Sequence, residues 1–423
     1  MNAAKRYPHI PANVVILAFE GPDRYSMVGG LGVRVTELAQ ALGACGFSTD
    51  VFFIGDPDAP PVETWAENVR LRRWCQWISK YHPASVYDGE GGKINDFTTS
   101  VPPVIMSEIV QPARERGERI LVLAEDWQVA PATLRLDYEL RQAGVRDSAV
   151  LLWNANNTYG FETINWPLLE RAAHLTGVSK YMKFELALRG VQSLVIPNGI
   201  PETLTEQQNE DAVDTLKRAL RGRKTLLKVG RYDPDKRWMQ AIDALADLRG
   251  NNRSAQLIVR GGKEPYGETI FARARARGLT IEDLTFAECA PEQLAAALAS
   301  TTSDIVNLKS FLPNETLYAL YGAVDAVLAN SGKEPFGLVG LEVMASRGIP
   351  VCGSTGEDYA RPFENAIVCD TDDPFELAVY LTQLFDDKSL AKRIRKRAQK
   401  TAQQYVWPAV FDIMDTKLAV MEG

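Results

Sequence analysis

The chain has 423 residues, of which 46% are hydrophobic and 24% are charged, and its formal net charge is −7. This length is too great for a single hydrophobic core and predicts two domains of about 200 residues each. The negative charge argues against nucleic acid as the main partner, and no apolar run reaches the roughly 18 residues of a membrane span.

The N-terminus and the cysteines predict a cytoplasmic protein. The segment Met1–Pro8 lacks the apolar stretch of a signal peptide. The five cysteines are odd in number and no two have C-x-x-C spacing, so we interpret them as reduced thiols. The three histidines are scattered, which argues against a histidine-rich metal site. We expect neither a metal ion nor a bound cofactor.

Short apolar runs alternate with longer helical patterns along the whole chain, which is typical of doubly wound α/β sheets. The strands predicted in the first half are Val14–Phe19, Val51–Ile54, Ile120–Ala124, Val150–Trp153, Leu175–Val178 and Leu194–Ile196. Those predicted in the second half are Leu226–Val229, Leu257–Val259, Leu284–Phe286, Ile305–Leu308, Val327–Leu328, Val351–Cys352 and Ile367–Val368.

A cluster of turn residues at Pro197–Pro201 marks the expected hinge between two domains. The expected domains are residues 1–200 and 201–404. From Tyr405 onward the pattern is helical, with a break expected at Pro408. The basic run Lys392–Arg397 is interpreted as a solvated helix face. A membrane-binding face is the alternative, and nothing else indicates membrane association.

A glycine-rich turn follows the first predicted strand, Val14–Phe19, and opens a helix predicted over Val33–Leu42. The turn consists of Gly29, Gly30, Leu31 and Gly32. Glycines at a strand-to-helix turn let the backbone approach a ligand closely. This turn can therefore approach a ligand closely.

Two strands of the second half lead to basic residues. Arg231 and Lys236 follow the strand Leu226–Val229, and Arg260 follows the strand Leu257–Val259. Loops at the carboxyl ends of parallel strands meet at one edge of the sheet, so Arg231 and Lys236 are expected to converge on one anion. Two such cations stabilise a departing diphosphate in place of a metal ion. Arg260 is expected to help line the nucleotide pocket.

The segment Glu334–Glu342 is the most informative in the chain. Two glutamates eight residues apart flank the turn Pro335–Leu338, which opens a predicted helix. The N-terminus of a helix presents unpaired N–H groups and favours anions. Glu334 is then held before the helix, and Glu342 lies about one turn inside it. This arrangement suits a ligand with a central diphosphate and hydroxyl-rich ends, such as a sugar nucleotide.

These motifs resemble those of the retaining glycosyltransferases of the GT-B fold, in particular family 4 and the glycogen synthase-like type. The resemblance is strongest from Leu226 to Gly356. It implies an α/β protein with two Rossmann-like, doubly wound domains facing a cleft, and a helix at 405–423 that crosses back to the first domain. The implied activity is transfer of a sugar, expected to be glucosyl, from a nucleoside-diphosphate sugar to the hydroxyl of a carbohydrate or another small acceptor.

The resemblance also implies roles in the second domain. Glu342 would bind the ribose hydroxyls, and Glu334 would contact the donor sugar and stabilise positive charge on it. The groups that would stabilise the leaving diphosphate are the amides of Phe336, Gly337 and Leu338 together with the side chains of Arg231 and Lys236.

In the first domain the segment Glu125–Gln128 resembles the family segment whose aspartate, here Asp126, lies near the acceptor. Asn154 stands where glycogen synthases have a histidine that binds the transferred sugar, so the resemblance implies a sugar contact for this amide.

The turn of Gly29, Gly30, Leu31 and Gly32 resembles the family's loop that covers the donor diphosphate, which implies donor contacts for these residues. Met27 and Val33 stand where glycogen synthases have a lysine and an aspartate beside this turn. These two departures argue against glycogen synthesis.

Several alternatives remain open at this stage. An epimerase or hydrolase of the same fold would need a proton-transfer group near the sugar, for which only Asp126 is a candidate. A non-catalytic nucleotide-sugar-binding protein is a third class. The D-x-D patterns at Asp56–Asp58 and Asp233–Asp235 are interpreted as loop chemistry and not as a metal site. The aromatic-rich segment Trp74–Lys93 is either an acceptor platform or a packed structural flap.

Overall fold

The computed structural model describes residues 6–206 and 209–422 and divides the chain into two units. The first unit takes the described residues up to Pro201 and again from Tyr405 onward, and the second runs from Glu202 to Gln404. Residues 1–5, which begin the segment used to predict a cytoplasmic protein, lie outside the described residues. None of the described helices combines the length and the apolar character needed to cross a membrane.

The first unit is built on an eight-stranded sheet of order β3-β4-β2-β1-β5-β6-β7-β8. All of its strand pairs are parallel except β3–β4, which is antiparallel. The strands are β1 (Asn13–Leu17), β2 (Ser48–Ile54), β3 (Val62–Ala66), β4 (Val69–Trp74), β5 (Ile120–Glu125), β6 (Ala149–Ala155), β7 (His174–Gly177) and β8 (Leu194–Val195).

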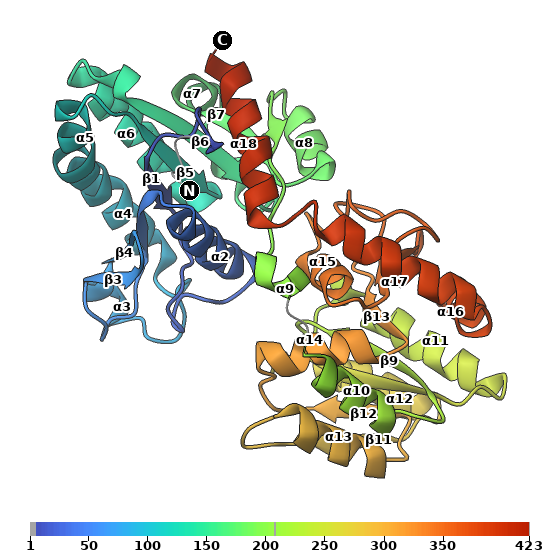
Figure 1. Cartoon of the computed structure of the whole chain (residues 1–423). Coiled ribbons are helices and arrows are strands. Elements are labelled where there is room, and N and C mark those ends of the chain that lie inside the picture. The colour runs from blue at the N-terminus through green and yellow to red at the C-terminus, as the bar shows by residue number, and fades with distance from the viewer. Residues whose placement is uncertain (1–5, 207–208, 423) are drawn as a thin grey trace. The chain divides into compact units, whose positions relative to one another are not determined.

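Helices flank this sheet (Figure 1). They are α2 (Gly30–Ala44), α3 (Gln76–Ser79), α4 (Glu90–Ile105), α5 (Gln111–Glu115), α6 (Ala130–Gln142), α7 (Trp166–Ala172), α8 (Lys180–Ala187) and α18 (Trp407–Glu422). In α2 the buried residues Val35, Leu38 and Leu42 recur at helical spacing and face the core. Helix α18 contributes Phe411 and Leu418 to the same core, so the end of the chain completes the first unit.

The second unit is built on a seven-stranded, all-parallel sheet of order β11-β12-β10-β9-β13-β14-β15. Its strands are β9 (Lys224–Val229), β10 (Ala255–Arg260), β11 (Ile281–Leu284), β12 (Ile305–Leu308), β13 (Ala326–Ala329), β14 (Pro350–Cys352) and β15 (Ile367–Val368). Its helices are α9 (Glu202–Glu206), α10 (Glu210–Ala219), α11 (Trp238–Gly250), α12 (Tyr266–Ala276), α13 (Pro291–Ser300), α14 (Asn314–Ala323), α15 (Leu338–Ala345), α16 (Pro374–Asp386) and α17 (Lys388–Ala402).

The two sheets confirm the predicted class of doubly wound α/β domains, with four local corrections. Strands β3 and β4 were not predicted, and β11 lies three residues before the strand expected at Leu284–Phe286. Pro408 does not break the last helix, because it is the second residue of α18, where a missing N–H is tolerated. The basic run is only partly solvated, because Arg395 is half-buried and donates to the backbone carbonyl of Val324.

The strand order determines which loops meet. In the first sheet β1 lies between β2 and β5, and in the second β9 lies between β10 and β13. The chain therefore changes direction across the sheet beside β1 and beside β9. In open α/β sheets such switch points leave a crevice at the carboxyl ends of the strands, where ligands bind.

Candidate functional site

The switch point of the second unit holds an ion pair between the two loops predicted to form the donor site. Lys236 follows β9 and Glu334 follows β13, and the Lys236 Nζ lies 2.7 Å from the Glu334 Oε2. The same nitrogen lies 3.3 Å from the Ser331 Oγ. The side chains are 30% and 20% exposed, so both remain accessible to a ligand. The structure thus brings together the cation and the carboxylate that the sequence predicted.

Two further cations lie at this edge of the sheet. Arg231 is exposed in the loop after β9, and Arg260 is half-buried at the end of β10, the neighbouring strand. Within the described part of the chain neither guanidinium has an ion-pair partner or a hydrogen-bond acceptor. The two guanidiniums therefore add positive charge beside the Lys236–Glu334 ion pair.

Helix α15 begins beside this ion pair. Gly337 precedes it with φ +83°, a left-handed conformation that favours glycine. A Cβ on Gly337 would also lie 2.7 Å from the Glu357 Cγ, so the position has no room for a side chain. The amides of Gly337 and Leu338 have no acceptor within residues 6–206 and 209–422. Phe336 is buried, and its ring packs edge-on against Tyr359 at 5.7 Å.

A second carboxylate faces Glu334. Glu357, in the loop after β14, accepts hydrogen bonds from the amides of Gly353 and Thr355 at 3.2 and 3.3 Å. Burial and the nearby charge of Glu334 raise the pKa of Glu357 to about 7. Glu357 was not among the site residues predicted from the sequence. The loop's position after a strand of the same sheet is the signal that would have identified it.

Glu342 lies on α15, as predicted, and is half-buried. Burial raises its pKa to about 7. Its side chain has no hydrogen-bond partner within the described residues, so its acceptor oxygens remain available.

A buried lysine lies beneath the ion pair. Lys228, on β9, donates to the backbone oxygen of Leu328 at 3.1 Å and to the Asn330 Oδ1 at 2.7 Å. Burial, with repulsion from Lys236, lowers the pKa of Lys228 to about 7. The sequence analysis missed this residue because it lies inside an apolar strand. A lysine within an apolar strand is the sequence feature that could have identified Lys228.

The glycine-rich turn of the first unit binds an internal carboxylate. The Glu20 Oε2 accepts hydrogen bonds from the amides of Val28, Gly29 and Gly32 at 3.2, 2.9 and 3.0 Å. Glu20 was not predicted, although it comes directly after the expected strand Val14–Phe19. The amides of Gly29 and Gly32 thus already have an internal acceptor, and donor binding by these two residues stays a prediction. The amides of Gly30 and Leu31 have no acceptor among the described residues.

Asn154 belongs to a buried network. Its Nδ2 donates to the Glu125 Oε2 at 2.9 Å and its Oδ1 accepts from the Thr176 hydroxyl at 2.9 Å. Glu125 in turn forms a two-bond ion pair with Arg34, with distances of 3.0 and 3.1 Å. Asn154 is 4% exposed. It therefore holds Glu125 in place, and its expected contact with a sugar stays a prediction.

Asp126 lies next to this network in a strained conformation. Its φ of +71° is unusual for a residue other than glycine. Its carboxylate accepts from the amide of Asn156 at 2.7 Å and from the Asn157 Nδ2 at 2.6 Å. Burial raises the pKa of Asp126 to about 7, and the charge of Glu125 adds to the shift while the Asn156 bond opposes it. A carboxyl with this pKa exchanges a proton near neutral pH.

Both D-x-D patterns make local side-chain-to-backbone hydrogen bonds, and their interpretation as loop chemistry and not as a metal site stays a prediction. The Asp56 Oδ1 accepts from the amide of Asp58 at 2.9 Å, and the Asp233 Oδ1 accepts from the amide of Asp235 at 2.8 Å. These are local turns in which the first aspartate binds the backbone two residues on.

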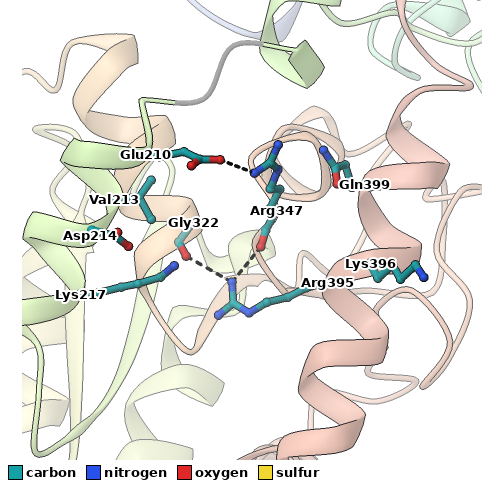
Figure 2. A pocket seen from close by; sticks show the side chains of 9 residues that line it. All are labelled: Glu210, Val213, Asp214, Lys217, Gly322, Arg347, Arg395, Lys396 and Gln399. Carbon is teal, nitrogen blue, oxygen red and sulfur yellow. Dashed lines mark hydrogen bonds and ion pairs between the residues drawn. The ribbon is translucent and has the colours of Figure 1, made fainter.

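A cavity of about 430 Å³ in the second unit is lined by α10, α17 and the residues Gly322 and Arg347 (Figure 2). Two of its cations are already bound by protein groups. Arg395 donates to the backbone oxygens of Gly322 and Arg347 at 3.3 and 2.8 Å, and Arg347 pairs with Glu210 at 2.9 Å. We assign no ligand to this cavity.

Residues 214–401 match the model of the family glycosyl transferases group 1. A D-inositol 3-phosphate glycosyltransferase of Thermomonospora curvata is 28% identical over 198 residues, which are 44% of this chain and 40% of that protein. The matched region thus spans two fifths of the length of that curated relative.

Solved structures resemble the chain over nearly its whole length. Sucrose-phosphate synthase of Thermosynechococcus elongatus has a TM-score of 0.70 at 19% identity and covers 97% of this chain and 99% of its own. Anabaena Alr3699/HepE in complex with UDP has a TM-score of 0.64 at 15% identity, with coverage of 96% and 99%. These likenesses extend over both units and confirm the GT-B fold.

Proposed function

We propose that this chain, whose residues 214–401 match the model of the glycosyl transferases group 1, transfers a glycosyl group from a nucleoside-diphosphate sugar to an acceptor hydroxyl with retention of configuration. We take glucose as the expected donor sugar. The UDP bound in the Anabaena protein supports a nucleotide-linked sugar donor.

One observation supports this proposal most directly. The switch point of the second sheet combines the ion pair Lys236–Glu334, the cations Arg231 and Arg260, and the amides of Gly337 and Leu338, which lack an acceptor among the described residues. A diphosphate needs several donors and positive charges, and each cation about 4 Å from a phosphate oxygen contributes on the order of 4 kcal/mol at an effective dielectric constant near 20. Glu342 supplies free acceptors for ribose hydroxyls one turn further along α15.

In the proposed reaction the bond between the anomeric carbon and the diphosphate oxygen breaks, and a bond to the acceptor oxygen forms on the same face. The acceptor proton passes to the departing phosphate. Lys236 and Arg231 stabilise the negative charge that develops on the diphosphate, while Glu334 stabilises positive charge on the sugar. The Lys236–Glu334 pair thus places a positive charge for the diphosphate and a negative charge for the sugar next to each other.

In the first domain we assign Asp126 to the acceptor. Its strained backbone is fixed by a hydrogen bond from its amide to the Asn154 carbonyl at 3.0 Å and by one from the Trp153 Nε1 to its carbonyl at 3.0 Å. Asn154 acts as a positioning residue, because its side chain holds Glu125. Within the glycine-rich turn, Gly30 and Leu31 remain the candidates for a contact with the donor.

A thermal-shift screen of nucleoside diphosphates and their sugars tests the donor class. At least one diphosphate should raise the melting temperature. Arg231→Ala should weaken its binding about tenfold or more, because a charge-assisted hydrogen bond is lost. Arg221→Ala is the matched control, since Arg221 is exposed at the opposite end of β9. The proposal fails if no diphosphate binds or if both variants behave alike.

Labelled donor incubated without acceptor separates the remaining classes. Release of free sugar indicates a hydrolase, and an isomerised donor indicates an epimerase. A donor that binds but changes only in the presence of an acceptor supports transfer. A donor that binds and never reacts with any acceptor tested indicates a binding protein.

Turnover should survive chelation by EDTA. The positive charge that a divalent cation supplies in other transferases comes here from Lys236, Arg231 and Arg260. We expect the same kcat and donor KM in the presence of EDTA as in its absence. Loss of activity that Mn²⁺ or Mg²⁺ restores would contradict this assignment.

A further inference from the structure

The structure separates the aromatic residues of the segment Trp74–Lys93 into two groups. Trp74 and Tyr87 are held internally, through a Trp74 Nε1 bond to the Ser100 hydroxyl at 2.6 Å and through a Tyr87 hydroxyl bond to Glu20. Trp77 and Tyr81 are 63% and 81% exposed. The first pair forms a structural flap, whereas the second pair has no comparable packing role.

The exposed pair borders a cavity of about 460 Å³ in the first unit. Its other lining groups include His82 at the end of the α3 turn and Asn95, Asp96 and Thr99 on α4. No hydrogen bond of the Asn95 side chain is found within the described residues. Two aromatic faces therefore adjoin an amide, a carboxylate and a hydroxyl.

The charge of this cavity excludes an anionic ligand. No lysine or arginine lines it, whereas Asp96 does, and Asp88 lies 3.1 Å from the His82 ring. A phosphate, a nucleotide or an anionic lipid surface would meet negative charge there. A neutral ligand with an apolar face and polar edges fits, because aromatic rings bury C–H groups while amide and carboxylate groups bond hydroxyls. A saccharide has this chemistry.

Helix α4 places the cavity away from the Asp126 loop. Glu90, in the first turn of α4, accepts from the Gln128 Nε2 at 3.3 Å, which marks the face of α4 that meets this loop. At 100° per residue, Asn95 and Thr99 lie roughly 140° and 180° around the helix from Glu90. One sugar ring therefore cannot contact Asp126 and the cavity together.

We propose that Trp77 and Tyr81 form a second, non-catalytic saccharide site, which binds an inner part of a neutral oligosaccharide acceptor. This inference rests on the proposed transferase function and specifies its acceptor class as a saccharide of more than one ring. Binding at this site raises the local concentration of the acceptor without taking part in the reaction.

A printed array of neutral α- and β-linked hexose oligosaccharides tests the site with the full chain. Wild type should bind at least one glycan, and Trp77→Ala and Tyr81→Ala should each weaken that binding about tenfold, because an exposed aromatic face loses its buried contact area. Tyr138→Ala is the matched control, since Tyr138 is 54% exposed on α6. For a glycan that serves as acceptor, Trp77→Ala should raise its KM and leave kcat unchanged.

Three outcomes overturn the proposal: no glycan binds wild type, Tyr138→Ala weakens binding as much as Trp77→Ala, or Trp77→Ala lowers kcat alone. The thermal shift with nucleoside diphosphate serves as an independent readout, and Trp77→Ala should not change it. If that shift is absent while glycans bind, the transferase proposal fails and the saccharide site stands. If the shift is present and glycans do not bind, only the saccharide site fails.

Discussion

Glu334→Ala lowers kcat by about 10²–10³-fold and changes the donor KM only a few-fold. This is the size expected when one preorganised group that stabilises developing charge is removed. Glu334 lies 2.7 Å from Lys236, which neutralises it before the donor binds. When a diphosphate competes for Lys236, the carboxylate is left to face the sugar, where positive charge develops. Its contribution is therefore largest in the transition state, which affects kcat.

Glu342→Ala is the matched comparison, because both residues are half-buried glutamates at opposite ends of the same motif. Contacts to ribose are the same in the ground state and the transition state, so this variant should raise the donor KM and leave kcat nearly unchanged. Steady-state kinetics with varied donor separates the two patterns. Equal increases in KM from both variants would remove the role assigned to Glu334.

The candidate site residues of the second domain were easier to predict from the sequence than those of the first domain. Arg231, Lys236 and Glu334 each follow an apolar strand within eight residues, and parallel strands place such loops at one edge. The left-handed Gly337 before α15 was likewise indicated by the Pro-Phe-Gly turn. These inferences need only local sequence and the rule for parallel sheets.

Contacts between side chains that are distant in the sequence could not be predicted from the sequence. A glycine-rich turn has the same sequence whether its amides bind a ligand or Glu20, and only the three-dimensional position of that carboxylate decides between them. The partner of Asn154 was equally hard to predict, because its side-chain amide donates to Glu125, which lies 29 positions earlier in the chain. The resemblance to a family implied ligand contacts for both positions and could not indicate these internal partners.

Strands β3 and β4 were missed for a different reason. Strand β4 carries Arg70, Arg72 and Arg73, which interrupt the apolar pattern expected of a buried strand. The structure compensates this charge internally, since Arg70 and Arg72 both bond to Asp50 on the neighbouring β2. A prediction based on apolar periodicity cannot anticipate that an arginine is neutralised by a carboxylate on the adjacent strand.

The largest stability effect is expected at Arg34, the cation that joins the parts of the first domain. It forms two bonds to Glu125 and one to the Asn198 side chain, and its guanidinium lies 5.8 Å from the ring centre of Trp407 at the start of α18. Arg34 and Glu125 are 4% and 1% exposed. Removing one partner of such a pair leaves a buried charge uncompensated, at a cost of about 3–5 kcal/mol.

Arg34→Met should therefore destabilise the first domain by about 3–5 kcal/mol, and Arg34→Met combined with Glu125→Leu by less than the sum of the single changes. Because a two-domain chain need not unfold in one step, amide hydrogen exchange in β5 and β6 is the suitable measurement, with β9 and β10 as an internal reference. Arg135→Met is the control, since its pair with Glu139 is exposed and should cost below about 1 kcal/mol. Strictly additive effects, or a loss at Arg34 no larger than at Arg135, would show that the buried pair does not hold the first domain together.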